Sequence, residues 1–182
     1  MAVVGLGLAI EAWHTLSALA WRERGFDPRG VFALTVRAQA EPVDEGVRDW
    51  QTLVLHLQGL AGTEAAGAAT ELPIERSRWC AEVHLWSPGG ARSAIRAGLH
   101  VVDPGFLSAM RIRHLRGTTM EQASRTRAPA VWVSRVVEQR WLGGSHEGWS
   151  IEYMLRTWPI AGVLDDIDRG LVEPRIEPEI FL

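Results

Sequence analysis

The sequence predicts a single α+β domain with a mainly antiparallel sheet, an N-terminal helix, one further short helix region, and a C-terminal β-hairpin followed by an extended tail. The chain has 182 residues, of which 47% are hydrophobic and 23% charged, as in an ordinary globular domain. Helical and strand-like segments do not alternate regularly along it, which disfavours a parallel βαβ sheet. We therefore expect one domain over residues 1–170 and an extended acidic tail over residues 171–182.

The first predicted elements are one helix and two strands. Residues 8–24 carry apolar side chains at helical spacing and end before Gly25, which favours a helix. The uncharged stretch 2–10 is too short to span a bilayer, so a buried helix is preferred to a membrane anchor or a signal sequence. Residues 31–38 and 50–58 read as strands, because apolar and polar residues alternate well in the second of them.

A long Ala/Gly-rich loop, residues 59–78, separates these strands from the next. It is interpreted either as a loose excursion or as an arm that becomes ordered against a partner. Residues 79–86 predict a strand, and Asp103-Pro104 can start a short helix. Residues 130–142 and 149–158 are predicted to form the arms of a hairpin around a Gly-rich loop.

Composition excludes several classes of protein. The net charge of −3 and the pI of about 6.1 give no overall nucleic-acid signature. The single cysteine rules out an internal disulfide framework and a multi-cysteine zinc site, and it fits a reducing compartment. The six histidines are scattered, and Gly5-Leu6-Gly7 lacks the third small residue of a dinucleotide fingerprint, so neither a metal nor a cofactor is expected. All positive side chains are arginine and nine residues are tryptophan, a bias that indicates a high-GC bacterial or phage genome.

The candidate catalytic residues are His56, Glu82 and His84. Alternation places all three on one face of the predicted sheet, together with Ser134 and Glu152. A carboxylate beside an imidazole holds its tautomer and raises its pKa, which suits proton transfer. A sheet face that is exposed to solvent or covered by a partner shows the same alternation, and we prefer this non-catalytic interpretation.

The candidate partner-binding residues lie in two segments of opposite charge. Arg111, Arg113 and Arg116 belong to segment 111–127, which has five arginines against one glutamate. Such a patch fits phosphate, a protein partner or plain solvent. The acidic tail ends in three apolar residues, which either dock on their own domain or insert into another chain: Ile180, Phe181 and Leu182.

The leading hypothesis is a non-enzymatic assembly or interaction subunit of a larger protein complex. It would dock through its C-terminal arm and its Arg-rich segment, in a homo- or hetero-oligomer, in the cytoplasm or in an intracellularly assembled particle. The first alternative is a small-molecule enzyme or binding domain that uses the His/Glu face. The second is a nucleic-acid-binding subunit acting through Arg111–Arg127. No membrane contact is expected.

Overall fold

The computed structural model describes residues 24–36, 43–73, 79–126, 129–170 and 176–182, with no side-chain description for 43–49. The predicted helix over residues 8–24 therefore falls almost wholly outside the described residues. The helices are α2 (Val43–Gln58), α3 (Pro104–Ala109), α4 (Met120–Thr126) and α5 (Arg135–Trp141). The strands are β1 (Cys80–Trp86), β2 (Arg92–His100), β3 (His114–Gly117), β4 (Val131–Ser134), β5 (Ser150–Tyr153), β6 (Arg156–Leu164) and β7 (Glu179–Phe181).

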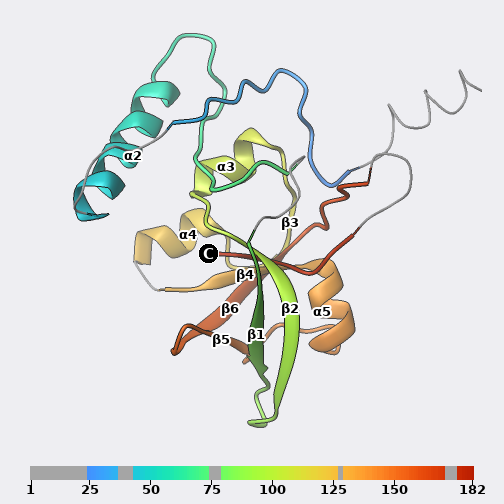
Figure 1. The fold of residues 1–182 in the computed structure, drawn as a ribbon. Helices are drawn as coiled ribbons and strands as arrows, with labels where there is room; N and C mark the ends of the chain where they lie inside the picture. The colour runs from blue at the N-terminus through green and yellow to red at the C-terminus, as the bar shows by residue number, and fades with distance from the viewer. Residues whose placement is uncertain (1–23, 37–42, 74–78, 127–128, 171–175) are drawn as a thin grey trace, which may run out of the picture.

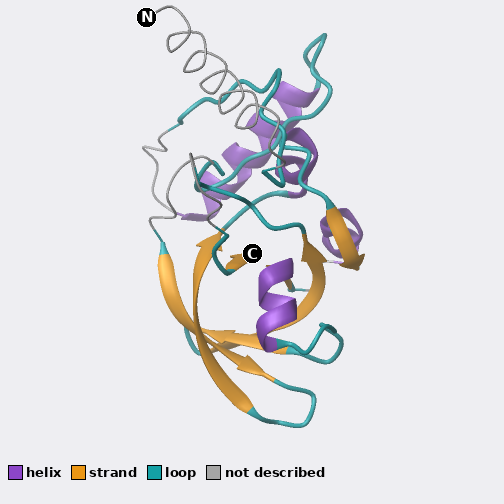
Figure 2. Ribbon diagram, turned by 90° about the vertical axis from the view of Figure 1, so that its right-hand side faces the viewer, coloured by secondary structure: helices purple, strands orange, loops and turns teal. Residues whose placement is uncertain are grey.

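The strands form one sheet that closes on itself. Their order is β3-β6-β4-β7-β2-β1-β5, and an additional pairing of β5 with β6 closes a barrel of all the strands except β3, which is added outside β6. Two neighbouring pairs are parallel, β2 with β7 and β4 with β6, and the others are antiparallel. Figure 1 shows the barrel below α2, α3 and α4, and Figure 2 shows α5 lying against the side that faces the viewer.

The apolar core has two parts. One fills the barrel with side chains such as Val83, Leu85, Val133, Val163 and Ile180, each fully buried. The other lies between the barrel and helices α3 and α4, and it includes Phe106, Met110, Met120, Trp132 and Phe181. An eight-stranded barrel is just wide enough to be filled by side chains, so this smaller one is a packed core.

The predicted fold class is wrong in two respects. The sheet is a closed barrel of mixed direction and not a mainly antiparallel open sheet. The C-terminal residues are also not an extension beyond a hairpin, because Glu179–Phe181 form β7, which lies between β2 and β4 near the middle of the strand order. The β2–β7 pairing joins residues about 80 positions apart, such as Leu99 with Ile180, and the β4–β7 pairing joins residues about 50 apart, such as Trp132 with Phe181, so no local pattern predicts either of them.

One predicted strand is a helix, and the helical period explains the difference. Residues 50–58 form the end of α2, because Trp50, Leu53, Val54 and Leu57 also fit spacing i, i+3, i+4, i+7. Val54 on this stripe is 7% exposed, whereas Leu55 between its members is 66% exposed.

The predicted hairpin arm 130–142 is also divided. Residues 131–134 form β4 and residues 135–141 form α5. The Val136 N–H donates to Asp166 Oδ1 at 2.7 Å, so a carboxylate thirty residues away caps the first turn of this helix. The hairpin that does form joins β5 and β6 through Met154 and Leu155.

Two locally predicted elements are confirmed. The strand over 79–86 is confirmed as β1, and the helix starting at Asp103-Pro104 is confirmed as α3, whose first turn is capped by Asp103 Oδ1 accepting from the Phe106 N–H. The described part of the Ala/Gly-rich loop lies against α3, since the Asp103 N–H donates to the Ala68 carbonyl at 2.9 Å. Among the described residues, no helix is long and apolar enough to cross a membrane.

Candidate functional site

The outer face of β1 and β5 carries the polar residues that the sequence singled out there. His84 and Glu152 are register partners across the two strands, as their shared face predicted. The Trp86 indole N–H donates to Glu152 Oε2 at 2.7 Å, and Arg92 lies over the Trp86 ring with its guanidinium carbon 5.6 Å from the ring centroid. Arg92 also lies 3.5 Å from Glu152 Oε1, so this carboxylate is held by two neighbours on the outside of the barrel.

The candidate catalytic residues do not converge on one site. His84 and Glu82 share the outer face of β1, but Glu82 is exposed and faces Arg96 across β2. His56 lies on the exposed surface of α2, and Ser134 is fully buried, with its hydroxyl accepting from the Glu179 N–H. The residues His56, Glu82 and His84 therefore do not line a common cavity, and the solvated-face interpretation describes their surroundings.

The candidate arginines are each paired with a carboxylate. Arg113 Nε donates to Asp165 Oδ2 at 2.8 Å, and Arg116 Nη1 donates to Glu138 Oε2 at 2.7 Å. Arg111 lies 3.5 Å from carboxylate oxygens of both Asp27 and Glu64. These pairs offset the positive charge of the three arginines, which weakens the phosphate-binding interpretation of the segment. The relevant acids lie 22 to 84 positions away along the chain, which is why a local charge count missed them.

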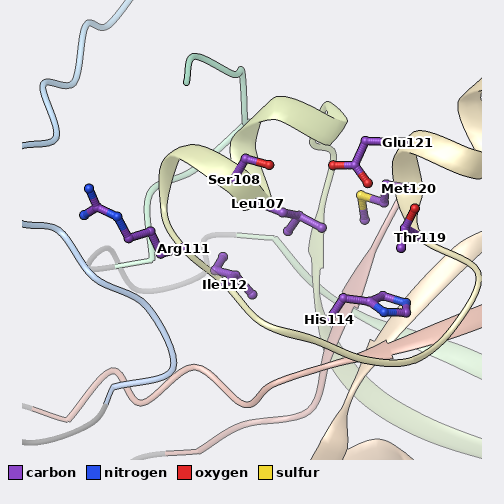
Figure 3. A pocket seen from close by; sticks show the side chains of 8 residues that line it. All are labelled: Leu107, Ser108, Arg111, Ile112, His114, Thr119, Met120 and Glu121. Carbon is purple, nitrogen blue, oxygen red and sulfur yellow. The ribbon is translucent and has the colours of Figure 1, made fainter. Parts of the chain in front are cut away.

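A shallow cavity of about 250 Å³ lies between α3, β3 and α4 and includes one of these arginines (Figure 3). The Arg111 side chain points away from His114 and Glu121 in this view. His114 Nε2 lies 3.2 Å from the Thr118 carbonyl, and the Thr119 hydroxyl accepts from the Gln122 N–H. Two of the polar side chains that line this cavity, His114 and Thr119, are thus engaged with nearby backbone groups.

A second, more open groove of about 300 Å³ lies at the end of the barrel near α4. Its lining is mostly apolar and comes from four separate parts of the chain: Val102, Pro104, Met120, Ala123, Ser124, Pro129, Ala130, Trp132, Trp158 and Leu182. Trp158 lies on β6, three residues after the β5–β6 turn. The groove and this hairpin therefore share one strand.

The β5–β6 turn exposes two large apolar side chains. Met154 is 72% exposed and Leu155 is 97% exposed. Both have left-handed backbones, with φ of 49° and 61°, as the central residues of a two-residue hairpin turn between the partners Tyr153 and Arg156. Such turns favour Asn-Gly, and neither residue here belongs to that class.

A buried charged cluster holds the C-terminal strand in the sheet. Arg169 donates to Glu179 Oε1 at 2.6 Å, and its guanidinium lies 3.2 Å from His100 Nε2. All three side chains are at most 4% exposed. Burial raises the pKa of Glu179 to about 7, against the opposing effect of Arg169, and burial together with Arg169 lowers the pKa of His100 to about 4.

Of the two alternatives for the apolar end of the tail, docking on its own domain is the one that the structure shows. Ile180 and Phe181 are 0% and 1% exposed, and the Phe181 ring packs against His100 at a centroid distance of 5.2 Å. The Leu182 N–H donates to the His100 carbonyl at 2.8 Å, and its side chain lines the apolar groove. Among the described residues, no group of three His, Cys, Asp or Glu side chains has a metal-binding arrangement.

Comparison with known proteins finds no family model and no curated sequence that matches the chain. Similar solved structures exist. They include a domain of a permease protein from Porphyromonas gingivalis (TM-score 0.46, 16% identity, 68% of this chain and 47% of that one). The periplasmic region of MacB from Actinobacillus actinomycetemcomitans is similar too (TM-score 0.44, 12% identity, 74% of this chain and 53% of that one). The extracellular domain of the noncanonic ABC-type transporter YknZ from Gram-positive bacteria is a third similar structure (TM-score 0.46, 13% identity, 70% of this chain and 58% of that one). This chain spans about half the length of each, and at TM-scores below 0.5 the matches carry no argument for a shared activity.

The prediction of a cytoplasmic assembly subunit is contradicted. The similar structures are described as permease, periplasmic and extracellular domains, and none is described as a cytoplasmic assembly protein. In the described part of the proposed docking arm, Ile180 and Phe181 are buried in β7 and are not free to insert into another chain. The single cysteine, Cys80, does not distinguish a reducing from an oxidising compartment, because one thiol cannot form an internal disulfide in either.

Proposed function

We propose that the chain is a protein-binding domain of a larger membrane-associated protein, and that its β5–β6 turn inserts into the partner. The observation that carries this proposal is the turn itself. Met154 and Leu155 combine left-handed backbones with almost complete exposure of two large apolar side chains. Folding of this domain gains nothing from either feature.

The turn works against the stability of the free domain. A non-glycine residue in the left-handed region costs roughly 1–2 kcal/mol. Asn-Gly in the same place would remove the strain and expose no large apolar group. Strained residues of this kind are typical of binding sites, where a partner recovers the energy that the free protein gives up. An apolar tip held rigidly by a hairpin also loses little conformational entropy when it enters a pocket.

The surroundings of the turn provide a larger docking surface. The apolar groove begins three residues along β6, at Trp158, and continues to Leu182 and α4. Exposed Arg156 and Arg125 lie beside the turn and beside the groove, respectively. A partner that presents an apolar pocket with acidic residues at its rim would match this surface.

In the described part of the chain, the packed interior of the barrel leaves no room for a substrate, which favours a function at the protein surface. Its described side chains are apolar and closely packed, with Val83, Leu85 and Val133 at 0% exposure. The buried charged groups are paired as well, Glu179 with Arg169 and Asp165 with Arg113. The barrel is therefore suited to holding its surface elements in place rather than to enclosing a substrate.

Membrane association is proposed from the sequence. Residues 1–21 contain one formally charged side chain, Glu11, and the next three residues are Arg22, Glu23 and Arg24. A stretch of this length can reach across a bilayer, with one central acidic residue costing about 2.5–3.5 kcal/mol. We expect the full chain to stay with the membrane pellet after alkaline extraction. Release of the wild-type chain into the supernatant would contradict this part of the proposal.

Photo-cross-linking in living cells tests the docking function. A benzoylphenylalanine replaces Leu155 in the full chain, and the same group at Gly89, on the tip of the other hairpin, is the matched control. Position 89 accepts a side chain, because its Cβ would meet nothing closer than Ser87 Oγ at 3.9 Å. We expect a protein adduct from position 155 and not from position 89. Lipid adducts at position 155, or equal labelling from both positions, would overturn the proposal.

A further inference from the structure

Residues 31–36 form an extended segment whose apolar side chains are left uncovered. Phe32, Leu34 and Val36 are 94%, 74% and 45% exposed. Alternate residues of an extended chain point to the same side, so these three make one apolar row. The sequence VFALTV contains no charge, glycine or proline, and its residue types favour a strand.

The backbone of this segment has no sheet partner among the described residues. The predicted strand 31–38 does not form over 31–36: these residues have no regular secondary structure and belong to no ladder of the sheet, although their backbone follows a drawn-out course in Figure 1. The Val31 N–H donates to the Pro28 carbonyl, and no other backbone hydrogen bond of residues 31–36 occurs within the described part of the chain. Figure 1 shows the segment, in blue, crossing above the barrel. An extended segment with unpaired N–H and C=O groups is a template for strand pairing.

The start of the segment is fixed firmly to the barrel. Phe26 is buried, and the Asp27 N–H donates to the Met110 carbonyl at 2.9 Å. Asp27 also accepts from the Arg29 backbone and side chain, and Arg111 Nη1 donates to the Arg29 carbonyl at 3.0 Å. These contacts present residues 31–36 from a fixed point, which lowers the entropy cost of pairing.

We propose that residues 31–36 are a docking strand, which adds to the exposed edge of a β-sheet in a partner protein. The unpaired backbone fits the hydrogen-bonding groups of a sheet edge, and the apolar row fits the packed face that such a sheet already has. A second copy of this segment fits less well, because the two apolar rows would lie together on one side of a two-stranded ribbon with nothing to cover them.

Cross-linking at two positions of the row tests the geometry of this pairing. Benzoylphenylalanine replaces Phe32 or Leu34 in the full chain in cells, with the exposed helical position Gln51 as control, and the attachment sites are sequenced. We expect both row positions to label one strand of a partner sheet, at sites two residues apart. The control position 51 should label neither of these two sites. Adducts on a helix, on a second copy of this chain, or at unrelated sites would overturn the proposal.

Proline substitutions test the backbone hydrogen bonds separately from the side chains. Neighbouring N–H groups of a strand point to opposite edges, so either Ala33→Pro or Leu34→Pro removes a donor that faces the partner. We expect at least one of them to abolish the adduct at position 32, while Leu34→Val retains it and all three leave the melting temperature unchanged. Retention of the adduct in both proline variants would overturn the proposal. The segment is separate from the β5–β6 turn, so either surface can fail its test without the other.

Discussion

Replacing Phe181 with alanine distinguishes a C-terminal core strand from a C-terminal arm. Phe181 is 1% exposed in β7 and packs in the cluster that joins the barrel to α3 and α4. Truncating a buried phenylalanine costs about 3–5 kcal/mol, from the lost burial and the cavity left behind. For a chain of this size, each kcal/mol lowers the melting temperature by about 2–4 °C. We therefore expect a fall of roughly 6–20 °C.

The same substitution at Phe32 is the matched control. That ring is 94% exposed, so its removal should change the free energy of unfolding by about 0.5 kcal/mol or less. Urea unfolding of the two variants and the wild type, followed by tryptophan fluorescence, measures both values. Equal destabilisation by Phe181→Ala and Phe32→Ala would refute the placement of the C-terminal residues in the core.

Three further predictions follow from individual contacts. Replacing Met154-Leu155 with Asn-Gly should raise the free energy of unfolding by about 1–2 kcal/mol, because it removes left-handed strain; an unchanged or lower value in urea unfolding would contradict the strained geometry. The pKa of His100 is lowered to about 4, so below its ordinary value of 6.5 the unfolded chain binds a proton that the folded chain does not. The wild type should therefore lose stability relative to His100→Gln as the pH falls from about 6.5 to about 4, and parallel pH profiles would count against this environment. Arg116→Ala should destabilise the chain by about 1–3 kcal/mol, because it leaves the Glu138 carboxylate buried without its partner; the double variant Arg116→Ala/Glu138→Gln should recover part of the loss, and no recovery would contradict the pairing.

Local patterns in the sequence predicted the elements that local physics determines. Alternation over residues 79–86 gave β1 and its buried side, because a strand with one face in the core must alternate. Asp103-Pro104 gave the start of α3, because an acceptor at the N-cap and proline in the first turn both suit a helix. The strand predicted over residues 50–58 is a helix, because Leu53 and Leu57 satisfy both the strand and the helix period.

Long-range pairing determined what local patterns could not predict. The acidic tail was predicted to be an extended arm, but Arg169 pairs with Glu179 inside the protein and β7 lies between β2 and β4 in the sheet. The arginine-rich segment looked like a basic patch, but Asp165 and Glu138, distant in sequence, pair with its members. The β5–β6 turn had no signal of its own, because Met-Leu is a rare pair for a turn of this type.

The most direct test of the docking function is how much of the protein captured at position 155 remains bound to variants of the turn. Quantitative mass spectrometry of material purified from the same cells compares the wild type, Met154→Asn/Leu155→Gly and Gly89→Asn. We predict that the turn variant, although more stable, keeps roughly a tenth or less of the partner, as expected when a central apolar anchor is removed, while Gly89→Asn keeps all of it. Equal recovery with all three chains would contradict a docking role for the turn.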